Sequence, residues 1–126
     1  MRLIFLNVFL ALSINVFGQD SKSSDTSFKL TDHIRNNFIK ESTNKGRLDY
    51  WTSIKGHELE GEKIESDYYV SKGDAAIIKW AYDLTTSGVK DKTAIISLYE
   101  ELKRRKISNN ELSYIDYGYN KALRKH

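Results

Sequence analysis

Histidines and their acidic neighbours are the first candidates for chemistry in this chain. The three histidines are His33, His57 and His126, and no two of them lie three or four residues apart. A zinc-protease helix needs a second histidine four residues after the first, and Gly61 occupies that place after His57. The run from His57 to Glu62 is better interpreted as a solvated acidic loop, with a weak cation site on its glutamates as the alternative. We therefore predict no metal site.

Nucleophiles and paired carboxylates give no stronger signal. No serine lies in a Gly-x-Ser-x-Gly turn, no glycine-rich phosphate loop occurs, and cysteine is absent. Asp32 and His33 are adjacent, but neighbouring helix residues point about 100° apart and cannot form the acid–histidine pair of a triad. The carboxylates available for sugar hydrolysis are Asp83, Glu100, Glu101 and Asp116. Sugar hydrolysis needs two carboxylates that face each other across a cleft, and the sequence positions of these four single out no pair. We therefore predict no catalytic residue and no cofactor.

Aromatic residues are better candidates for binding. Eight tyrosines and two tryptophans could form a surface that stacks on sugars or binds a peptide. Trp80 shares a helical stripe with Ile77 and Leu84, which favours a place in the core. Five other aromatic residues are the predicted binding residues. Tyr50 and Trp51 are flanked by polar residues, and Tyr68 and Tyr69 are neighbours of which strand spacing lets only one be buried. Tyr117 lies off the apolar stripe of the last helix.

The N-terminal residues predict the cellular location of the protein. Arg2 precedes the apolar run Leu3–Leu12, and Val16 and Gly18 stand at the −3 and −1 positions of a cleavage site. This order is typical of a secretory signal peptide over residues 1–18. The apolar run is about ten residues, against roughly 20 for a spanning helix, so we expect no membrane anchor after cleavage. The protein is then periplasmic or secreted.

The rest of the chain predicts one domain. Residues 19–28 are polar and predict a disordered leader, and residues 29–126 are sufficient for a single small helical domain. The chain carries a net charge of +3, with acids concentrated in residues 57–83 and bases in residues 90–126. An exported protein rarely meets nucleic acid, so we expect no nucleic-acid partner.

Capping patterns predict a mainly α fold, a small bundle of about four helices. The expected N-caps are Thr31, Ser71, Asp91 and Ser108. The first helix should cover residues 32–42, and the other three follow from residue 71 onward with very short links. Short links make consecutive helices pack antiparallel or at a sharp corner. The last three helices should therefore form a compact C-terminal three-helix unit that the first helix covers.

Residues 47–70 allow two interpretations. Residues 48–54 and 67–70 are rich in aromatic and β-branched side chains and could pair as a short β-hairpin. A short helix could instead turn Leu48, Trp51 and Ile54 inward. We favour irregular or helical structure here and keep the hairpin as the alternative.

The stretch Tyr114–Tyr119 places three tyrosines around a glycine. Tyr119 lies on the predicted inward stripe with Leu123 and should be buried, whereas Tyr117 should be the most exposed of the three. Gly118 costs a helix up to about 1 kcal/mol relative to alanine. The close approach of another helix would explain its presence.

Residues 75–99 resemble the two-helix unit of tetratricopeptide-type repeats. Trp80, Gly88, Ala94 and Tyr99 carry the resemblance. Such repeats recur at about 34 residues, and the residues 34 positions after Trp80 and Gly88 do not restore the pattern. The resemblance implies a packed helical hairpin and, by analogy, peptide binding.

Together these features predict an exported small helical interaction domain that binds a protein or peptide partner without catalysis. The alternative is a cell-wall or glycan-binding accessory protein, with or without weak hydrolase activity. Two facing carboxylates in a cleft beside Trp51 would favour the glycan-binding alternative. An apolar groove open to solvent would favour a protein partner.

Overall fold

The computed structural model describes residues 30–125, which form four helices and one β-hairpin. The elements are α1 (Asp32–Glu41), a 3-10 turn η1 (Thr52–Ile54), β1 (Gly61–Glu65), β2 (Tyr68–Ser71), α2 (Lys72–Thr86), α3 (Lys92–Lys103) and α4 (Asn109–Lys125). The predicted mainly α bundle of about four helices with a short hairpin is confirmed. The predicted signal peptide, residues 1–18, and leader, residues 19–28, lie outside the described residues.

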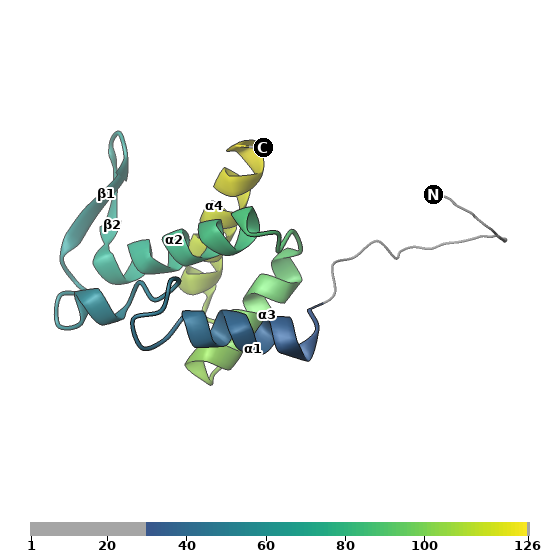
Figure 1. Cartoon of the computed structure of the whole chain (residues 1–126). Helices are drawn as coiled ribbons and strands as arrows, with labels where there is room; N and C mark the ends of the chain where they lie inside the picture. Colours follow the sequence, from purple (N-terminus) through teal and green to yellow (C-terminus); the bar gives the residue numbers. More distant parts are fainter. Residues whose placement is uncertain (1–29, 126) are drawn as a thin grey trace, which may run out of the picture.

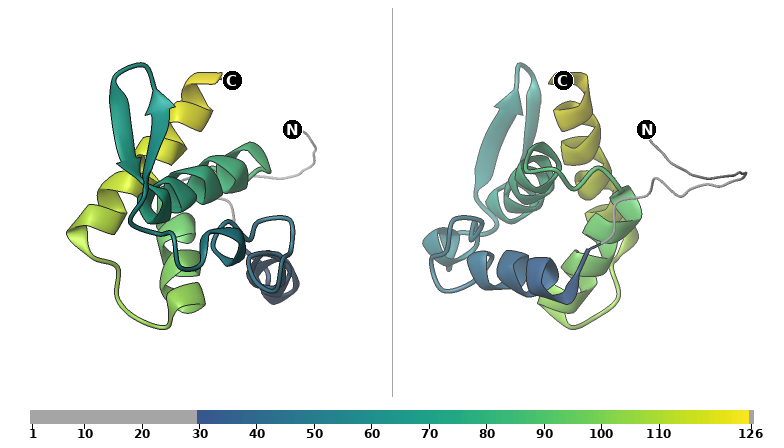
Figure 2. Two further views of the ribbon diagram at one scale, coloured as in Figure 1. Left: turned by 90° about the vertical axis from the view of Figure 1, so that its left-hand side faces the viewer. Right: turned by 45° about the vertical axis from the view of Figure 1, so that its right-hand side comes forward.

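Helix α2 is the centre of the arrangement (Figure 1). The hairpin and the C-terminal half of α4 rise from one side of α2, whereas α1 and α3 lie on its other side (Figure 2). Strands β1 and β2 pair antiparallel, with Glu62 opposite Val70 and Lys63 opposite Tyr69. Within residues 30–125, no helix is both long enough and apolar enough to cross a membrane.

Each helix begins at the cap that the sequence predicts. Thr31, Ser71 and Asp91 accept backbone N–H groups from the first turns of α1, α2 and α3. At α4 the Ser108 hydroxyl accepts from the Glu111 N–H at 3.2 Å, and the Glu111 carboxylate accepts from the Ser108 N–H at 2.9 Å. This reciprocal pair is a capping box, which fixes the corner between α3 and α4.

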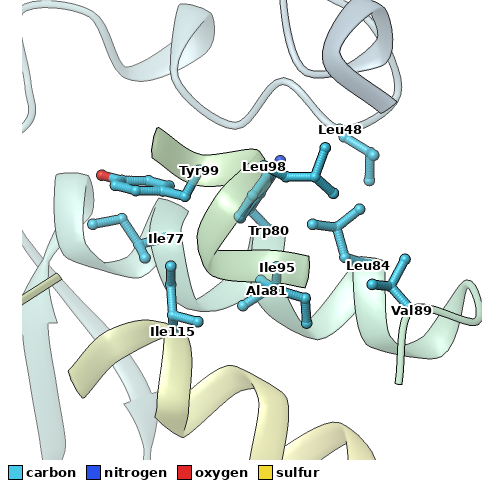
Figure 3. Packing of buried hydrophobic residues seen from close by; sticks show 10 residues of the cluster. All are labelled: Leu48, Ile77, Trp80, Ala81, Leu84, Val89, Ile95, Leu98, Tyr99 and Ile115. Atoms are coloured by element: carbon cyan, nitrogen blue, oxygen red, sulfur yellow. The ribbon is translucent and has the colours of Figure 1, made fainter. Parts of the chain in front are cut away.

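Trp80 lies at the centre of the core and is fully buried, as predicted (Figure 3). Its ring meets that of Tyr99 edge-on, with centroids 5.7 Å apart. Its indole N–H donates to the Ser42 hydroxyl at 2.9 Å, and that hydroxyl donates to the Phe38 carbonyl at 2.7 Å. Because a buried indole needs an acceptor, this chain of hydrogen bonds ties the end of α1 to α2.

The closest helix contact joins α2 and α4, and Gly118 makes it possible. A Cβ atom at position 118 would lie 2.3 Å from the Ile78 carbonyl oxygen and 3.1 Å from the Tyr82 nitrogen. The predicted close approach is therefore confirmed. The close helical hairpin that the repeat resemblance implied between α2 and α3 is wrong, because the backbone of α2 packs along α4, and α2 contacts α3 through core side chains such as Trp80 and Tyr99.

The favoured irregular or helical interpretation is wrong for residues 61–71, where the structure has the hairpin that was kept as the alternative. This hairpin pairs other residues than that alternative assumed. Residues 67–70 contribute to β2, but its partner is β1, Gly61–Glu65, rather than residues 48–54. Residues 48–54 instead form a turn followed by η1, because the Asp49 carboxylate accepts the backbone N–H groups of Trp51 and Thr52. Leu48 is fully buried at the start of this turn, as the helical interpretation expected, whereas Trp51 and Ile54 are only partly buried.

The three tyrosines of α4 are all partly buried. Tyr119 donates its hydroxyl to the Lys90 carbonyl at 2.7 Å. The hydroxyl of Tyr117 is out of contact with solvent, which gives no support to the prediction that Tyr117 would be the most exposed. Leu123 was predicted to face inward, but it is 39% exposed.

We expect Gly118→Ala to destabilise the fold by about 2 kcal/mol, because the added Cβ would collide with the backbone of α2. The collision outweighs the helix propensity that alanine gains, which is about 1 kcal/mol. Urea unfolding followed by circular dichroism measures the change. Gly73→Ala in α2 is the matched control, since its Cβ would meet nothing closer than 3.5 Å. Equal stability of the two variants would contradict the close-contact explanation.

Candidate functional site

A cleft of about 290 Å³ lies between the hairpin, α2 and the C-terminal turns of α4. We call it the hairpin cleft. Its lining residues are Tyr50, Glu62, Lys63, Ile64, Ile78, Lys79, Tyr82, Asp83, Lys121 and Lys125. Figure 2 shows the hairpin and the C-terminal half of α4 rising from the same side of α2, and residues of these three elements line the cleft.

Three elements position the lining. From α2, Ile78 and Tyr82 lie one helical turn apart and give an aliphatic and aromatic floor. Strand β1 supplies three consecutive residues, of which Ile64 turns toward the helices and Lys63 toward solvent. Helix α4 contributes Lys121 and Lys125, again one turn apart. Apolar groups therefore lie deep in the cleft and ammonium groups line its rim.

The charges of the cleft are unbalanced, with four lysines and two carboxylates among the lining residues. Lys79 pairs with Glu62 at 2.5 Å, and Lys121 lies 3.7 Å from Glu65 at the edge of the hairpin. Lys63 and Lys125 make no ion pair with any other residue in the range 30–125. Positive charge at the rim makes the local electrostatic potential more favourable for anionic groups, an effect that weakens as salt is raised.

Tyr50 is the one predicted binding residue that lines the hairpin cleft. Its hydroxyl donates to the Asp83 carboxylate on α2. Burial, followed by the hydrogen bond to Asp83 and its negative charge, raises the pKa of Tyr50 to about 12. The phenol is therefore neutral at physiological pH, and this bond connects the loop of residues 43–51 to the floor of the cleft.

Trp51 belongs to the edge of the core rather than to an open platform. Its ring lies 6.1 Å from that of Trp80, and the Lys103 ammonium sits 3.9 Å from its centroid. Burial, together with the nearby charge of Arg105, lowers the pKa of Lys103. One face of Trp51 is thus covered by a cation, which leaves less of the ring for stacking on a sugar.

A second hollow, of about 210 Å³, lies beside Trp51 and contains one carboxylate, that of Asp49. Burial alone would raise the pKa of Asp49, but hydrogen bonds from Thr52, Lys45 and Trp51 outweigh it and bring the pKa to about 2. Asp49 is therefore ionised and engaged in shaping its own turn. This hollow lacks the second carboxylate that hydrolysis requires and gives the glycan alternative no support.

The structure places two predicted residues together between the hairpin and α4. The rings of Tyr68 and Tyr117 lie 5.1 Å apart, so both hold the hairpin against the helix. Burial and the neighbouring charge of Glu65 raise the pKa of Tyr117 to about 12. Tyr69 points to the other face of the hairpin and is 65% exposed. Only one of the adjacent pair is packed, as strand alternation predicted.

Most of the hairpin cleft was not predicted from the sequence. The predicted binding residues were four tyrosines and Trp51, whereas the lining consists mainly of lysines and aliphatic residues from three separate elements. One local signal was available: residues 61–65 alternate in character, with Glu62 and Ile64 on one face of a strand. Within residues 30–125, no three acidic or histidine side chains converge as a metal site.

Comparison with known proteins adds no relative: no family model, no curated protein and no solved structure matches this chain.

We expect Asp83→Asn to lower the pKa of Tyr50 from about 12, because the substitution removes the carboxylate charge next to the phenol. Because the folded-state pKa of Tyr50 lies above the ordinary value near 10, its contribution to stability is complete below pH 10 and is lost between about pH 10 and 12. NMR titration of ring-labelled tyrosine measures the pKa directly. Tyr50→Phe assigns the signal, and an unchanged pKa in Asp83→Asn would refute the role of Asp83.

We expect Trp51→Ala to lower the stability of the fold by about 2 kcal/mol, because it removes the contact with Trp80 and the cation–π contact with Lys103. Tyr69→Ala is the matched control on an exposed aromatic residue and should change stability by less than about 0.5 kcal/mol. Urea unfolding measures both. Equal effects would mean that Trp51 is not part of the core.

Proposed function

We propose that this chain is an exported interaction domain that binds a protein or peptide partner through the hairpin cleft, without catalysis. One observation carries the proposal: the cleft combines an apolar floor, Ile78 and Tyr82, with a rim of lysines. An apolar hollow that a few polar groups surround is the usual form of a recognition site. It supports the binding of a segment that has apolar and acidic side chains.

Exposed apolar residues lie on or next to the elements that form the cleft. Among residues 30–125, the large apolar side chains that remain exposed are Leu59 at 94%, Tyr69 at 65% and Leu123 at 39%. Leu59 lies two residues before β1, Tyr69 lies on β2, and Leu123 lies on α4. None of them lines the hairpin cleft itself. Exposed apolar side chains near a cleft favour contact with another protein.

The expected setting is the periplasm or the exterior of the cell, since residues 1–18 have the pattern of a signal peptide. In that setting the partner is another exported protein or a peptide. Its acidic groups would match the lysines of the rim, and long-range attraction would speed the encounter.

We expect Lys125→Glu to weaken capture of the partner about tenfold, because it reverses a charge on the rim of the cleft. Lys106→Glu makes the same change of charge on an exposed residue outside the cleft and is the matched control. The purified chain and both variants are immobilised and used to capture proteins from the periplasm and medium of the source cells.

The proposal requires a protein that the wild type and Lys106→Glu retain and that Lys125→Glu loses. Its affinity is then measured by fluorescence titration at two salt concentrations. Capture of a glycan alone, or of proteins that all three forms bind equally, would contradict the proposed function.

A further inference from the structure

We infer that the partner binds as an extended acidic segment that adds a third strand to the open edge of β1. The inference rests on the proposed function and specifies the mode of binding at the hairpin cleft. Strand addition uses backbone hydrogen bonds for affinity and alternate side chains for specificity. It requires an unpaired strand edge, access to that edge, and side chains beside it that match the ligand.

The edge follows from the hydrogen-bond pattern of the hairpin. The Glu60 carbonyl accepts from the Lys72 N–H at 2.7 Å, which continues the ladder beyond β1. Since alternate residues of an antiparallel strand bond to the partner, Glu62 faces β2, whereas Gly61 and Lys63 direct their N–H and C=O groups away from it. The sheet has two strands among residues 30–125, so this edge of β1 has no strand beside it.

The open edge is accessible from the hairpin cleft. The residues Glu62, Lys63 and Ile64 all line the cleft, although successive side chains of a strand point to opposite faces. A single face of β1 could not supply all three, so the cleft is bordered by the edge of the strand itself. A peptide lying along this edge would have the α2 floor beneath it and α4 opposite.

The lysines specify the chemistry of the added strand. Alternate side chains of a strand on this edge would point toward the floor at Ile78 or outward toward the ammonium groups of Lys63 and Lys125. A segment that alternates aliphatic and acidic residues satisfies both. Lys63 on the edge also opposes pairing with the same edge of a second copy, because it would bring like charges together. An acidic strand from a partner is therefore favoured over self-association.

The probe is the peptide Ac-EVEVEV-NH2, titrated into the full chain with isothermal calorimetry. We expect Lys63→Pro to weaken binding at least tenfold relative to Lys63→Ala. Both substitutions remove the charge, but only proline removes the N–H that faces the open edge. Circular dichroism verifies that both variants fold. Two N-methylated peptides, one methylated at residues 2 and 4 and the other at residues 3 and 5, test the same contact from the ligand side.

Strand addition requires one methylated peptide to lose binding at least tenfold and the other to keep it, since alternate N–H groups face the strand. Equal effects of the two methylation patterns, no binding of the acidic peptide, or a dimer through β1 in sedimentation would overturn the inference. The proposed function is tested separately by the capture experiment. If Lys125→Glu loses the partner while the two methylation patterns have equal effects, the cleft binds its partner in a way other than strand addition, and only the inference fails.

Discussion

The contact between Gly118 and the backbone of Ile78 is the constraint on which the arrangement of the domain depends. A helix can approach another this closely only where a side chain is missing, and Gly118 is the position in α4 where the missing Cβ would meet the Ile78 carbonyl at 2.3 Å. The contact fixes where α4 crosses α2. Ala122, one turn further, is also fully buried, so small residues continue the seam.

The position of the hairpin follows from that crossing. Tyr68 packs on Tyr117, which neighbours Gly118, and Glu65 lies 3.7 Å from Lys121 one turn away. Glu62 pairs with Lys79 on α2 at 2.5 Å. The hairpin is thereby attached to both helices on the side that faces away from the core. A two-stranded hairpin alone is marginally stable, so these contacts to the helices maintain its shape and that of the cleft.

Local features of the sequence predicted local features of the structure. The caps at Thr31, Ser71, Asp91 and Ser108 depend on side chains within three residues of the groups that they bind. The core position of Trp80 follows from its helical stripe, and the close approach at Gly118 follows from the cost of a glycine inside a helix. The partner of Gly118 could not be predicted this way, because a missing side chain does not indicate which backbone takes its place. The repeat resemblance, for its part, implied that α2 would pack against α3, whereas α2 packs along α4.

The hairpin cleft could not be predicted from the sequence either, because its residues come together only in the folded chain. Its lysines come from β1, α2 and α4, and each alone has the character of an ordinary solvated residue. Aromatic residues were predicted to bind because such side chains are common in recognition sites, but the residue type does not determine whether a side chain lies in a cleft or in the core. Tyr50 and Trp51 are adjacent in sequence, but the Asp49 turn directs one to the cleft and the other to the core, under the ammonium of Lys103. Tyrosines in this domain mainly connect elements through ring contacts and hydroxyl bonds. The recognition surface that we propose therefore consists of the strand edge and the lysines around it.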